Sequence, residues 1–385
     1  MPSHLHGFLW RDWQRLSKQH LRGQPGTRHL LAWYVAVRAL ANSAIASFEP
    51  DAELTPELRE IWQHPIFILG LPRSGTTYLQ QLLATNAQLA YPRRFDCFNP
   101  WTFLTLQRLG IASLLGRLRP RSRTIDQVQI GWLSPEEDEF ALTGLTADGP
   151  WINRAFPRSQ PRPFATSHDD EIRERCWPWQ DALQLFTRKL IWLNQRTLVL
   201  KSPLHTGRVR ELLTLFPAAR FVTILRDPRE QFRSFIDVVK GTKTWGTLQT
   251  SPEVEDRWER IRRMADSQRV LLNSYFADRP KIPPSQLIEV TYEELIAEPR
   301  KHLKNIHEKL NIPGWKETAQ QLSTKLNRQI YQRNPPRTLN DMERDLAIHI
   351  YHDLFRNGYY LEVLRELRSP AINPPNPRSK DSESL

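Results

Sequence analysis

The sequence predicts an α/β protein in which a P-loop-type parallel sheet is flanked by helices. Short apolar runs stop at polar residues, and each run is followed by a pattern typical of an amphipathic helix. A glycine-containing segment, residues 70–77, separates the first run from its helix. Strands of a parallel sheet are buried on both faces and therefore read as continuous apolar runs. We expect repeated β–α units in one domain over residues 61–368, with a helical N-terminal extension over 1–60 and a helical insertion over 95–190.

Four strands are expected in chain order, at residues 66–69, 197–200, 221–225 and 287–290. After the first run, leucines recur at helical spacing at positions 79, 82 and 83. The second and third runs precede apolar residues spaced i, i+3, i+4 and i+7, namely Val209, Leu212, Leu213 and Phe216, then Phe232, Phe235, Ile236 and Val239. This spacing predicts helices that each bury one face against the sheet.

Three of the expected strands end in a cation or run into one. These cations are Arg73, Lys201 and Arg226. In parallel sheets, ligands bind outside the carboxyl ends of the strands. The sequence therefore predicts a site for a multiply charged anion at this edge.

The segment Gly70-x-x-x-x-Gly75-Thr76-Thr77 has the glycine spacing of a phosphate-binding loop. Its strand–loop–helix context supplies inward backbone N–H groups and a helix N-terminus. The lysine of nucleotide triphosphatases is replaced by Thr76, and a cation stands inside the loop at Arg73. No strand ends convincingly in an acidic magnesium ligand. A phosphate-like ligand is expected, with its reactive group handled without the usual lysine and magnesium.

The segment after the third strand has a physical logic of its own. Asp227 is suited to cap a helix, Pro228 to occupy its first position and Glu230 to complete a capping box. Ser234 lies off the apolar stripe, so it can face a ligand together with Arg226. A well-capped helix with an exposed serine is the purely structural alternative.

The composition is globular, with 39% hydrophobic and 25% charged residues among 385. A formal net charge of +12 favours anionic partners without choosing among them. Cys97 and Cys176 cannot form a disulfide framework. We expect no secretory signal, and the interrupted apolar run from Leu30 to Phe48 predicts a buried or amphipathic helix. Residues 369–385 are expected to form a disordered tail.

Leu71-Pro72-Arg73-Ser74-Gly75-Thr76-Thr77 resembles the 5′-phosphosulfate loop of the sulfotransferases that use 3′-phosphoadenosine-5′-phosphosulfate (PAPS). The segment from Arg226 to Ser234 is similar to the 3′-phosphate motif of that family. The resemblance covers roughly residues 66–298. It implies transfer of the sulfuryl group of PAPS to an acceptor hydroxyl, release of 3′,5′-adenosine bisphosphate, and no required metal.

The resemblance also implies roles for individual residues. The loop residues would bind the 5′-phosphosulfate: Pro72, Arg73, Ser74, Gly75, Thr76 and Thr77. The residues expected around the 3′-phosphate and adenosine are Arg226, Ser234, Tyr292 and, in a late basic loop, Arg333 and Arg337.

Arg73 and Lys201 are expected to stabilise charge during transfer, since electrostatic effects dominate reactions of this kind. For Lys201 this role is what the resemblance implies, because it matches a lysine that some members of the family use for it. The general base is left open among His205, Asp96, Glu136 and Glu139. The last two belong to a run of four acids, residues 136–139, expected in the first turn of a helix, where the dipole alone would explain them.

Two other functions remain open at this point. A P-loop kinase would share the fold and the glycine spacing, but the P-loop lysine that a kinase needs is absent from this sequence. A nucleic-acid-binding protein would fit the pI near 9.9, although no recognition module is apparent and we expect no nucleic-acid partner. The acceptor is unspecified, with a lipid or other apolar hydroxyl among the choices. A bacterial cytoplasmic enzyme is expected, with peripheral membrane contact through the basic N-terminus as an alternative.

Overall fold

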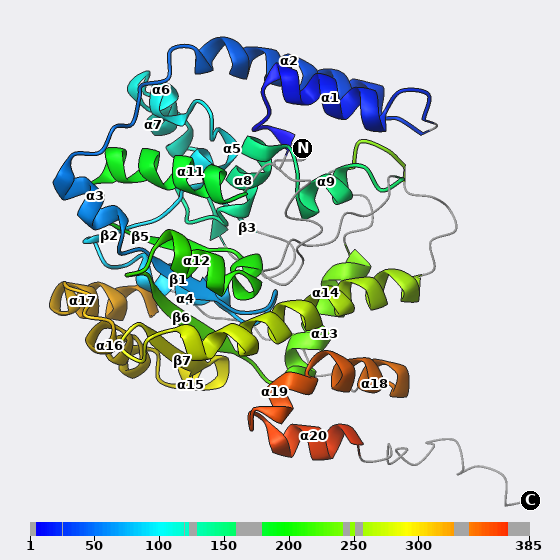
Figure 1. Cartoon of the computed structure of the whole chain (residues 1–385), viewed down its shortest axis with the longest axis vertical. Helices are drawn as coiled ribbons and strands as arrows, with labels where there is room; N and C mark the ends of the chain where they lie inside the picture. The colour runs from blue at the N-terminus through cyan, green and yellow to red at the C-terminus, as the bar shows by residue number, and fades with distance from the viewer. Residues whose placement is uncertain are drawn as a thin grey trace, which may run out of the picture.

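The computed structural model describes residues 5–24, 26–118, 120–122, 129–158, 179–241, 247–250, 257–326 and 339–368. Its centre is a parallel five-stranded sheet of order β2-β5-β1-β6-β7 (Figure 1). The strands are β2 (Leu89–Ala90), β5 (Thr197–Lys201), β1 (Ile66–Leu69), β6 (Arg220–Leu225) and β7 (Leu287–Thr291). The four predicted strands and the α/β class are confirmed. The two-residue strand β2 was not predicted.

The register brings the functional segments to one edge of the sheet. Ile68 of β1 is level with Lys201 of β5, and Leu69 is level with Thr223 of β6. Because all these strands are parallel, the 70–77 loop, Lys201 and Arg226 follow neighbouring strand ends.

Alternating residues of β1 serve the two faces of the sheet, as the strand period of two requires. Ile66 and Ile68 are buried beneath the first layer, which contains α4 (Thr76–Leu83), α15 (Tyr292–Ala297), α16 (Pro299–Lys309) and α17 (Trp315–Leu326). Phe67 and Leu69 are buried on the other face, in a cluster with residues of α5 (Arg94–Phe98), α8 (Glu139–Thr146), α11 (Trp179–Asn194), α12 (Val209–Leu215) and α14 (Arg257–Asp278).

A further layer of helices extends the core beyond the ends of β1 and β6. Leu71 and Leu225 pack there with buried residues of α13 (Pro228–Gly241), α14, α18 (Asp341–Ile350) and α19 (His352–Arg356). The chain then continues into α20 (Leu361–Arg368). Two short 3₁₀ turns, η2 (Pro203–Gly207) and η3 (Arg279–Lys281), both contact α14.

The N-terminal segment is helical, with α1 (Trp10–His20), α2 (His29–Ala46) and α3 (Pro56–Trp62). Helices α1 and α2 lie side by side at one end of the molecule (Figure 1). Their buried residues, among them Phe8, Trp13 and Val35, form a separate cluster with Ile152 and Phe156. Among the described residues, no helix is both long and apolar enough to cross a membrane.

Between β2 and β5 the described chain is mainly helical, with α5, α6 (Phe103–Arg108), α7 (Ile111–Gly116), α8, α9 (Pro150–Ala155) and α11. A two-stranded antiparallel ribbon, β3 (Arg121–Ser122) and β4 (Gln129–Ile130), was not predicted. Helix α8 begins at Glu139, so the prediction that all four acids of residues 136–139 occupy a first helical turn is wrong. Asp138 occupies the N-cap position of this helix, so the helix dipole leaves only Glu136 and Glu137 unexplained.

Candidate active site

The loop between β1 and α4 needs its glycines for close approach. Gly75 has φ +99°, and a Cβ there would lie 2.3 Å from Cδ2 of Tyr292. Gly70 has φ +147°, and a Cβ there would lie 2.7 Å from the Ile224 carbonyl oxygen. Arg73 also adopts a positive φ, 74°, which a residue with a Cβ rarely does. The chain is thereby folded into a tight turn that ends at the N-terminus of α4, an arrangement that suits anion binding.

The loop and the segment after β6 meet although they are far apart in sequence. Arg73 Nε donates a hydrogen bond to Ser234 Oγ at 3.0 Å, and Arg226 Nη1 donates to the Arg73 carbonyl oxygen at 2.8 Å. Gln231 Nε2 donates to the Pro72 carbonyl oxygen. The Arg226 guanidinium also lies 4.4 Å from the centre of the Tyr292 ring. The structure thus brings together Pro72, Arg73, Gly75, Arg226, Ser234 and Tyr292.

Local capping fixes where Arg226 and Ser234 lie. Asp227 Oδ1 accepts a hydrogen bond from the Arg229 backbone N–H at 2.8 Å, and α13 begins at Pro228. The predicted N-cap at Asp227 is therefore confirmed. The predicted capping box with Glu230 is wrong, because the Asp227 backbone N–H donates to Glu293 Oε1 at 3.1 Å instead. Phe232 and Phe235 are buried, whereas Ser234 between them is only partly buried. The serine hydroxyl is available beside the loop because it lies off the apolar stripe.

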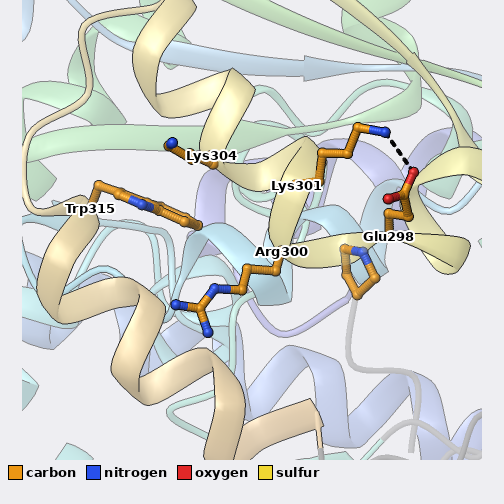
Figure 2. Close-up of a pocket in the computed structure, with 6 residues that line it drawn as sticks. Glu298, Arg300, Lys301, Lys304 and Trp315 are labelled. Carbon is orange, nitrogen blue, oxygen red and sulfur yellow. Dashed lines mark hydrogen bonds and ion pairs between the residues drawn. The ribbon is translucent and has the colours of Figure 1, made fainter.

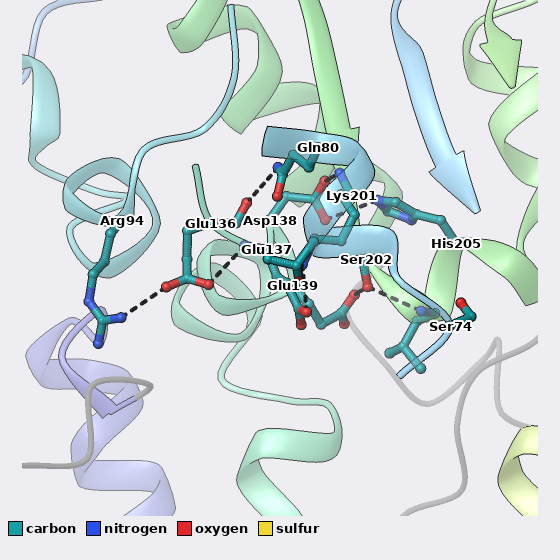
Figure 3. Close-up of polar contacts among 12 residues, drawn as sticks. Ser74, Gln80, Arg94, Glu136, Glu137, Asp138, Glu139, Lys201, Ser202 and His205 are labelled. Atoms are coloured by element: carbon teal, nitrogen blue, oxygen red, sulfur yellow. Dashed lines mark hydrogen bonds and ion pairs between the residues drawn. The ribbon is translucent and has the colours of Figure 1, made fainter. Parts of the chain in front are cut away.

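Lys201, the last residue of β5, is the third cation at this edge. Its side chain is 2% exposed, and Nζ lies 2.7 Å from Glu137 Oε1 (Figure 3). Lys201 Nζ also lies 3.5 Å from Thr77 Oγ1. The Lys201 backbone N–H donates to Asp138 Oδ2 at 3.1 Å. Lys201 is thus held between the loop and the acidic segment 136–139.

Each of the four acids has its own partner. Glu136 pairs with Arg94 at 3.1 Å, and burial raises the pKa of Glu136, partly offset by Arg94 and Lys201. Asp138 Oδ1 lies 3.0 Å from His205 Nε2, and both side chains are fully buried.

Glu139 Oε2 accepts hydrogen bonds from Arg208 at 2.9 Å and from Ser202 at 3.0 Å. Among the four side chains, Glu137 is the most exposed, at 22% against 11% for Glu136.

Asp96 and His205 lie in the interior. Asp96 Oδ1 is 2.7 Å from Arg93 Nη2, its side chain is fully buried, and this burial raises its pKa against the opposing effect of Arg93. His205 packs edge-on against Phe67. Both residues thus have partners within the protein, and a catalytic role for either stays a prediction.

Arg333 and Arg337 lie outside the described residues. The sequence reasoning missed Glu137 as an individual candidate, although it noted the acidic run. No local signal distinguishes Glu137 from its neighbours, because its partner Lys201 is 64 residues away.

An open groove of about 600 Å³ lies elsewhere on the molecule, between α16 and α17 (Figure 2). It is lined by Glu298, Pro299, Arg300, Lys301, Lys304 and Trp315, none of which belongs to the candidate site. Within the part of the chain that the structure describes, no group of three or more His, Cys, Asp or Glu residues is arranged to hold a metal ion.

The chain is similar to curated proteins and to solved structures. Two curated relatives, omega-hydroxy-beta-dihydromenaquinone-9 sulfotransferases Stf3 of Mycobacterium bovis and Mycobacterium tuberculosis, are each 28% identical over 251 residues. This alignment covers 64% of the present chain and spans 63% of the length of the relatives.

Solved structures show the same fold. Sulfotransferase STF9 from Mycobacterium avium superposes with a TM-score of 0.67 at 18% identity, covering 90% of this chain and 91% of that one. Sulfotransferase STF1 from Mycobacterium tuberculosis gives a TM-score of 0.54 at 19% identity, with coverage of 82% and 86%. A model of the sulfotransferase family matches residues 65–317, which include the loop, Lys201 and the Arg226–Ser234 segment. The prediction made from those segments is confirmed: the chain belongs to the sulfotransferase family.

Proposed function

We propose that this sulfotransferase moves the sulfuryl group of PAPS onto the hydroxyl of an apolar, lipid-like acceptor. The observation that carries the proposal is the convergence of three segments at neighbouring strand ends. Arg73 of the loop contacts Ser234 at 3.0 Å, and Lys201 lies 3.5 Å from Thr77 of the same loop.

On the donor side, the turn at Gly75 and the first N–H groups of α4 would hold the 5′-phosphosulfate, with Ser74, Thr76 and Thr77 beside them. Arg226 and Ser234 would hold the 3′-phosphate, which distinguishes PAPS from ordinary nucleotides. Tyr292 lies against Gly75 and Arg226, where its ring would pack on the adenosine.

In the transfer itself, the acceptor oxygen forms a bond to sulfur while the bond from sulfur to the bridging phosphate oxygen breaks. Negative charge grows on the leaving phosphate oxygen, and Arg73 and Lys201 would stabilise it. The hydroxyl proton must leave at the same stage. We assign that proton to the Glu137 carboxylate, because it is the most exposed of the four acids and contacts Lys201 at 2.7 Å.

An aromatic cluster adjoins the acidic segment and suits an apolar acceptor. Phe140 stacks on Trp151 with ring centres 4.6 Å apart, and its ring meets Phe98 edge-on at 5.4 Å. Trp132 continues the cluster on Phe98. Trp132, Phe140 and Trp151 are only partly buried. The Stf3 relatives are named for a hydroxylated menaquinone, so we propose a hydroxylated lipid as the acceptor class and residues 95–190 as the acceptor side.

Calorimetry with 3′,5′-adenosine bisphosphate tests the donor assignment. We expect binding that weakens roughly 10- to 100-fold in Arg226→Ala, because a charge-assisted hydrogen bond is worth about 1.5–3 kcal/mol. Adenosine 5′-monophosphate, which lacks the 3′-phosphate, should bind the parent and the variant equally weakly. Arg262→Ala, an exposed arginine on α14, is the matched control and should bind as the parent does.

Preference for ATP with magnesium, with no loss in Arg226→Ala, would favour a kinase and contradict the proposal. Repeating the titration with a chelator tests the expectation that no metal is needed.

A further inference from the structure

The outer face of α2 carries an exposed apolar stripe. Leu30 is 89% exposed, Trp33 68%, Val37 45% and Leu40 56%. These residues are spaced i, i+3, i+7 and i+10, so they share one side of the helix. Val35, Ala39 and Asn42 are buried on the side toward the protein. We call the four exposed residues the α2 stripe.

Further exposed apolar residues lie beyond the C-terminal end of α2, toward α6. Phe48 follows the C-terminal end of α2, is 76% exposed, and its carbonyl oxygen accepts a hydrogen bond from Thr105 Oγ1. The adjoining α6–α7 segment exposes three more leucines, Leu109, Leu114 and Leu118, at 68%, 59% and 55%. Exposed apolar side chains thus gather over this end of the molecule, although large apolar patches are uncommon on monomeric soluble proteins.

The segment that contains the α2 stripe, residues 13–48, carries a net positive charge. Residues 13–48 contain no Asp or Glu, whereas the whole chain has 42 among 385 residues. The same stretch contains five cations, Arg15, Lys18, Arg22, Arg28 and Arg38. Arg15, Lys18 and Arg22 are exposed on α1 and in the turn that follows it, next to α2. An anionic surface is therefore the complementary partner.

These helices also lie beside the proposed acceptor side. Val35 and Ala39 of α2 belong to the same buried cluster as Ala147 and Ile152. Ala147 directly follows α8, and Ile152 lies in α9. The Arg15 guanidinium donates to the Thr146 carbonyl oxygen of α8 at 3.2 Å. In Figure 1, α2 runs along the outer edge of the molecule, with α1, α6 and α8 on its inner side.

We propose that the α2 stripe inserts into the interfacial layer of an anionic lipid bilayer, with α2 parallel to the membrane plane. The inference rests on the proposed function, since it explains how a lipid hydroxyl reaches the site. A helix of 18 residues is about 27 Å long, and its apolar side chains reach the boundary between headgroups and acyl chains. A second copy is the less suitable occupant, because a symmetric contact through this face would bring two sets of cations together.

Co-sedimentation with vesicles tests the proposal on the full chain. The probes are vesicles of phosphatidylcholine alone and of an equimolar mixture with phosphatidylglycerol. We expect the parent to bind the mixed vesicles, and Trp33→Ser/Leu40→Ser to lower the partition coefficient at least tenfold, about 1.4 kcal/mol. Met264→Ser/Val270→Ser changes two exposed apolar residues on α14, 42% and 43% exposed, and should bind as the parent does.

Charge is tested separately. Lys18→Glu/Arg22→Glu should abolish the preference for anionic vesicles, and added salt should weaken parent binding. Equal partitioning of the parent and Trp33→Ser/Leu40→Ser would overturn the proposal. If the parent does not bind vesicles but forms a dimer in light scattering, and Trp33→Ser disrupts that dimer, the stripe is a contact surface for a second copy instead.

Binding of 3′,5′-adenosine bisphosphate separates this inference from the proposed function. The stripe variants should keep the parent's affinity, because α2 contributes no residue to the nucleotide site. Vesicle binding without bisphosphate binding would refute the proposed function alone, and the reverse result would refute the membrane inference alone.

Discussion

Neighbouring residues of the acidic segment have different environments. Glu136 is paired with Arg94 and largely buried, whereas Glu137 contacts Lys201 and is twice as exposed, at 22% against 11%. A carboxylate that accepts a proton from a substrate must be reachable by that substrate. The environment of each carboxylate, and not its residue type, is therefore the basis on which Glu137 is proposed as the general base.

Replacing this carboxylate should affect turnover and not nucleotide binding. We expect Glu137→Gln to lower kcat roughly 10²- to 10⁴-fold, the usual contribution of a general base. The affinity for 3′,5′-adenosine bisphosphate should stay within a few-fold. Glu136→Gln is the matched control. A larger loss of kcat in Glu136→Gln than in Glu137→Gln would refute the assignment.

Gly75 offers a second test at this scale. A methyl group there would overlap the Tyr292 ring, at 2.3 Å from Cδ2, and the positive φ is costly for alanine. Gly75→Ala should therefore reduce bisphosphate binding at least tenfold by displacing Tyr292 or the loop. Gly110→Ala is the control for backbone strain alone, since nothing lies within 4 Å of its Cβ position at φ +74°. Equal effects of both changes on binding would contradict the account.

The sequence identifies the loop and the Arg226–Ser234 segment because each is a local pattern next to a recognisable strand. It cannot choose among the acids. Glu136, Glu137 and Glu139 take their partners from Arg94, Lys201 and Arg208, which lie 42, 64 and 69 residues away. Such pairs are set by tertiary packing, which no local spacing reports.

Among the secondary-structure elements, the end of strand β5 and the start of α8 are connected by hydrogen bonds to carboxylates. Asp138 accepts from the Lys201 backbone N–H, and Glu139 binds both Ser202 and Arg208. These contacts hold Lys201 at the strand end. The long strands were predictable from their apolar runs, whereas β2 and the β3–β4 ribbon have only two residues per strand, too few to produce a pattern.

Glu139 should matter for stability more than for chemistry. Its carboxylate and Arg208 are both nearly buried, with side chains 6% and 5% exposed. Removing one partner of a buried pair costs about 3–5 kcal/mol, because the other charge stays uncompensated.

Urea denaturation of Glu139→Gln should show this loss, and Glu139→Gln/Arg208→Met should recover part of it. Glu259→Gln, in an exposed pair with Arg262, should cost less than about 1 kcal/mol. An unchanged unfolding free energy with a collapse of kcat would instead make Glu139 a catalytic residue.

At the scale of the whole molecule, His6 links the N-terminal helices to the rest of the chain. Its ring lies against Tyr34 of α2 and against Phe98 of α5. Burial, helped by Arg38, lowers the pKa of His6 from 6.5 to about 4. The neutral ring therefore contributes stability that is complete above pH 6.5 and is lost as the pH falls through about 4.

This shift predicts acid sensitivity of the N-terminal attachment. Between pH 7 and pH 4.5 the parent should lose about 2–3 kcal/mol more unfolding free energy than His6→Gln, whose side chain does not titrate. Urea denaturation at both pH values measures the difference. His29→Gln, at an exposed position, should lose as much as the parent. Identical pH dependence of the parent and His6→Gln would show that His6 does not titrate as described.

Mass spectrometry of a reaction containing PAPS and an ω-hydroxylated menaquinone in mixed vesicles tests most directly whether the sulfuryl group is transferred to a lipid hydroxyl. We expect a product heavier by one SO₃ group, an equal amount of 3′,5′-adenosine bisphosphate, and loss of both in Lys201→Ala. A panel of hydroxylated lipids and small alcohols that yields no sulfated product, or a phosphorylated product formed from ATP, would contradict it.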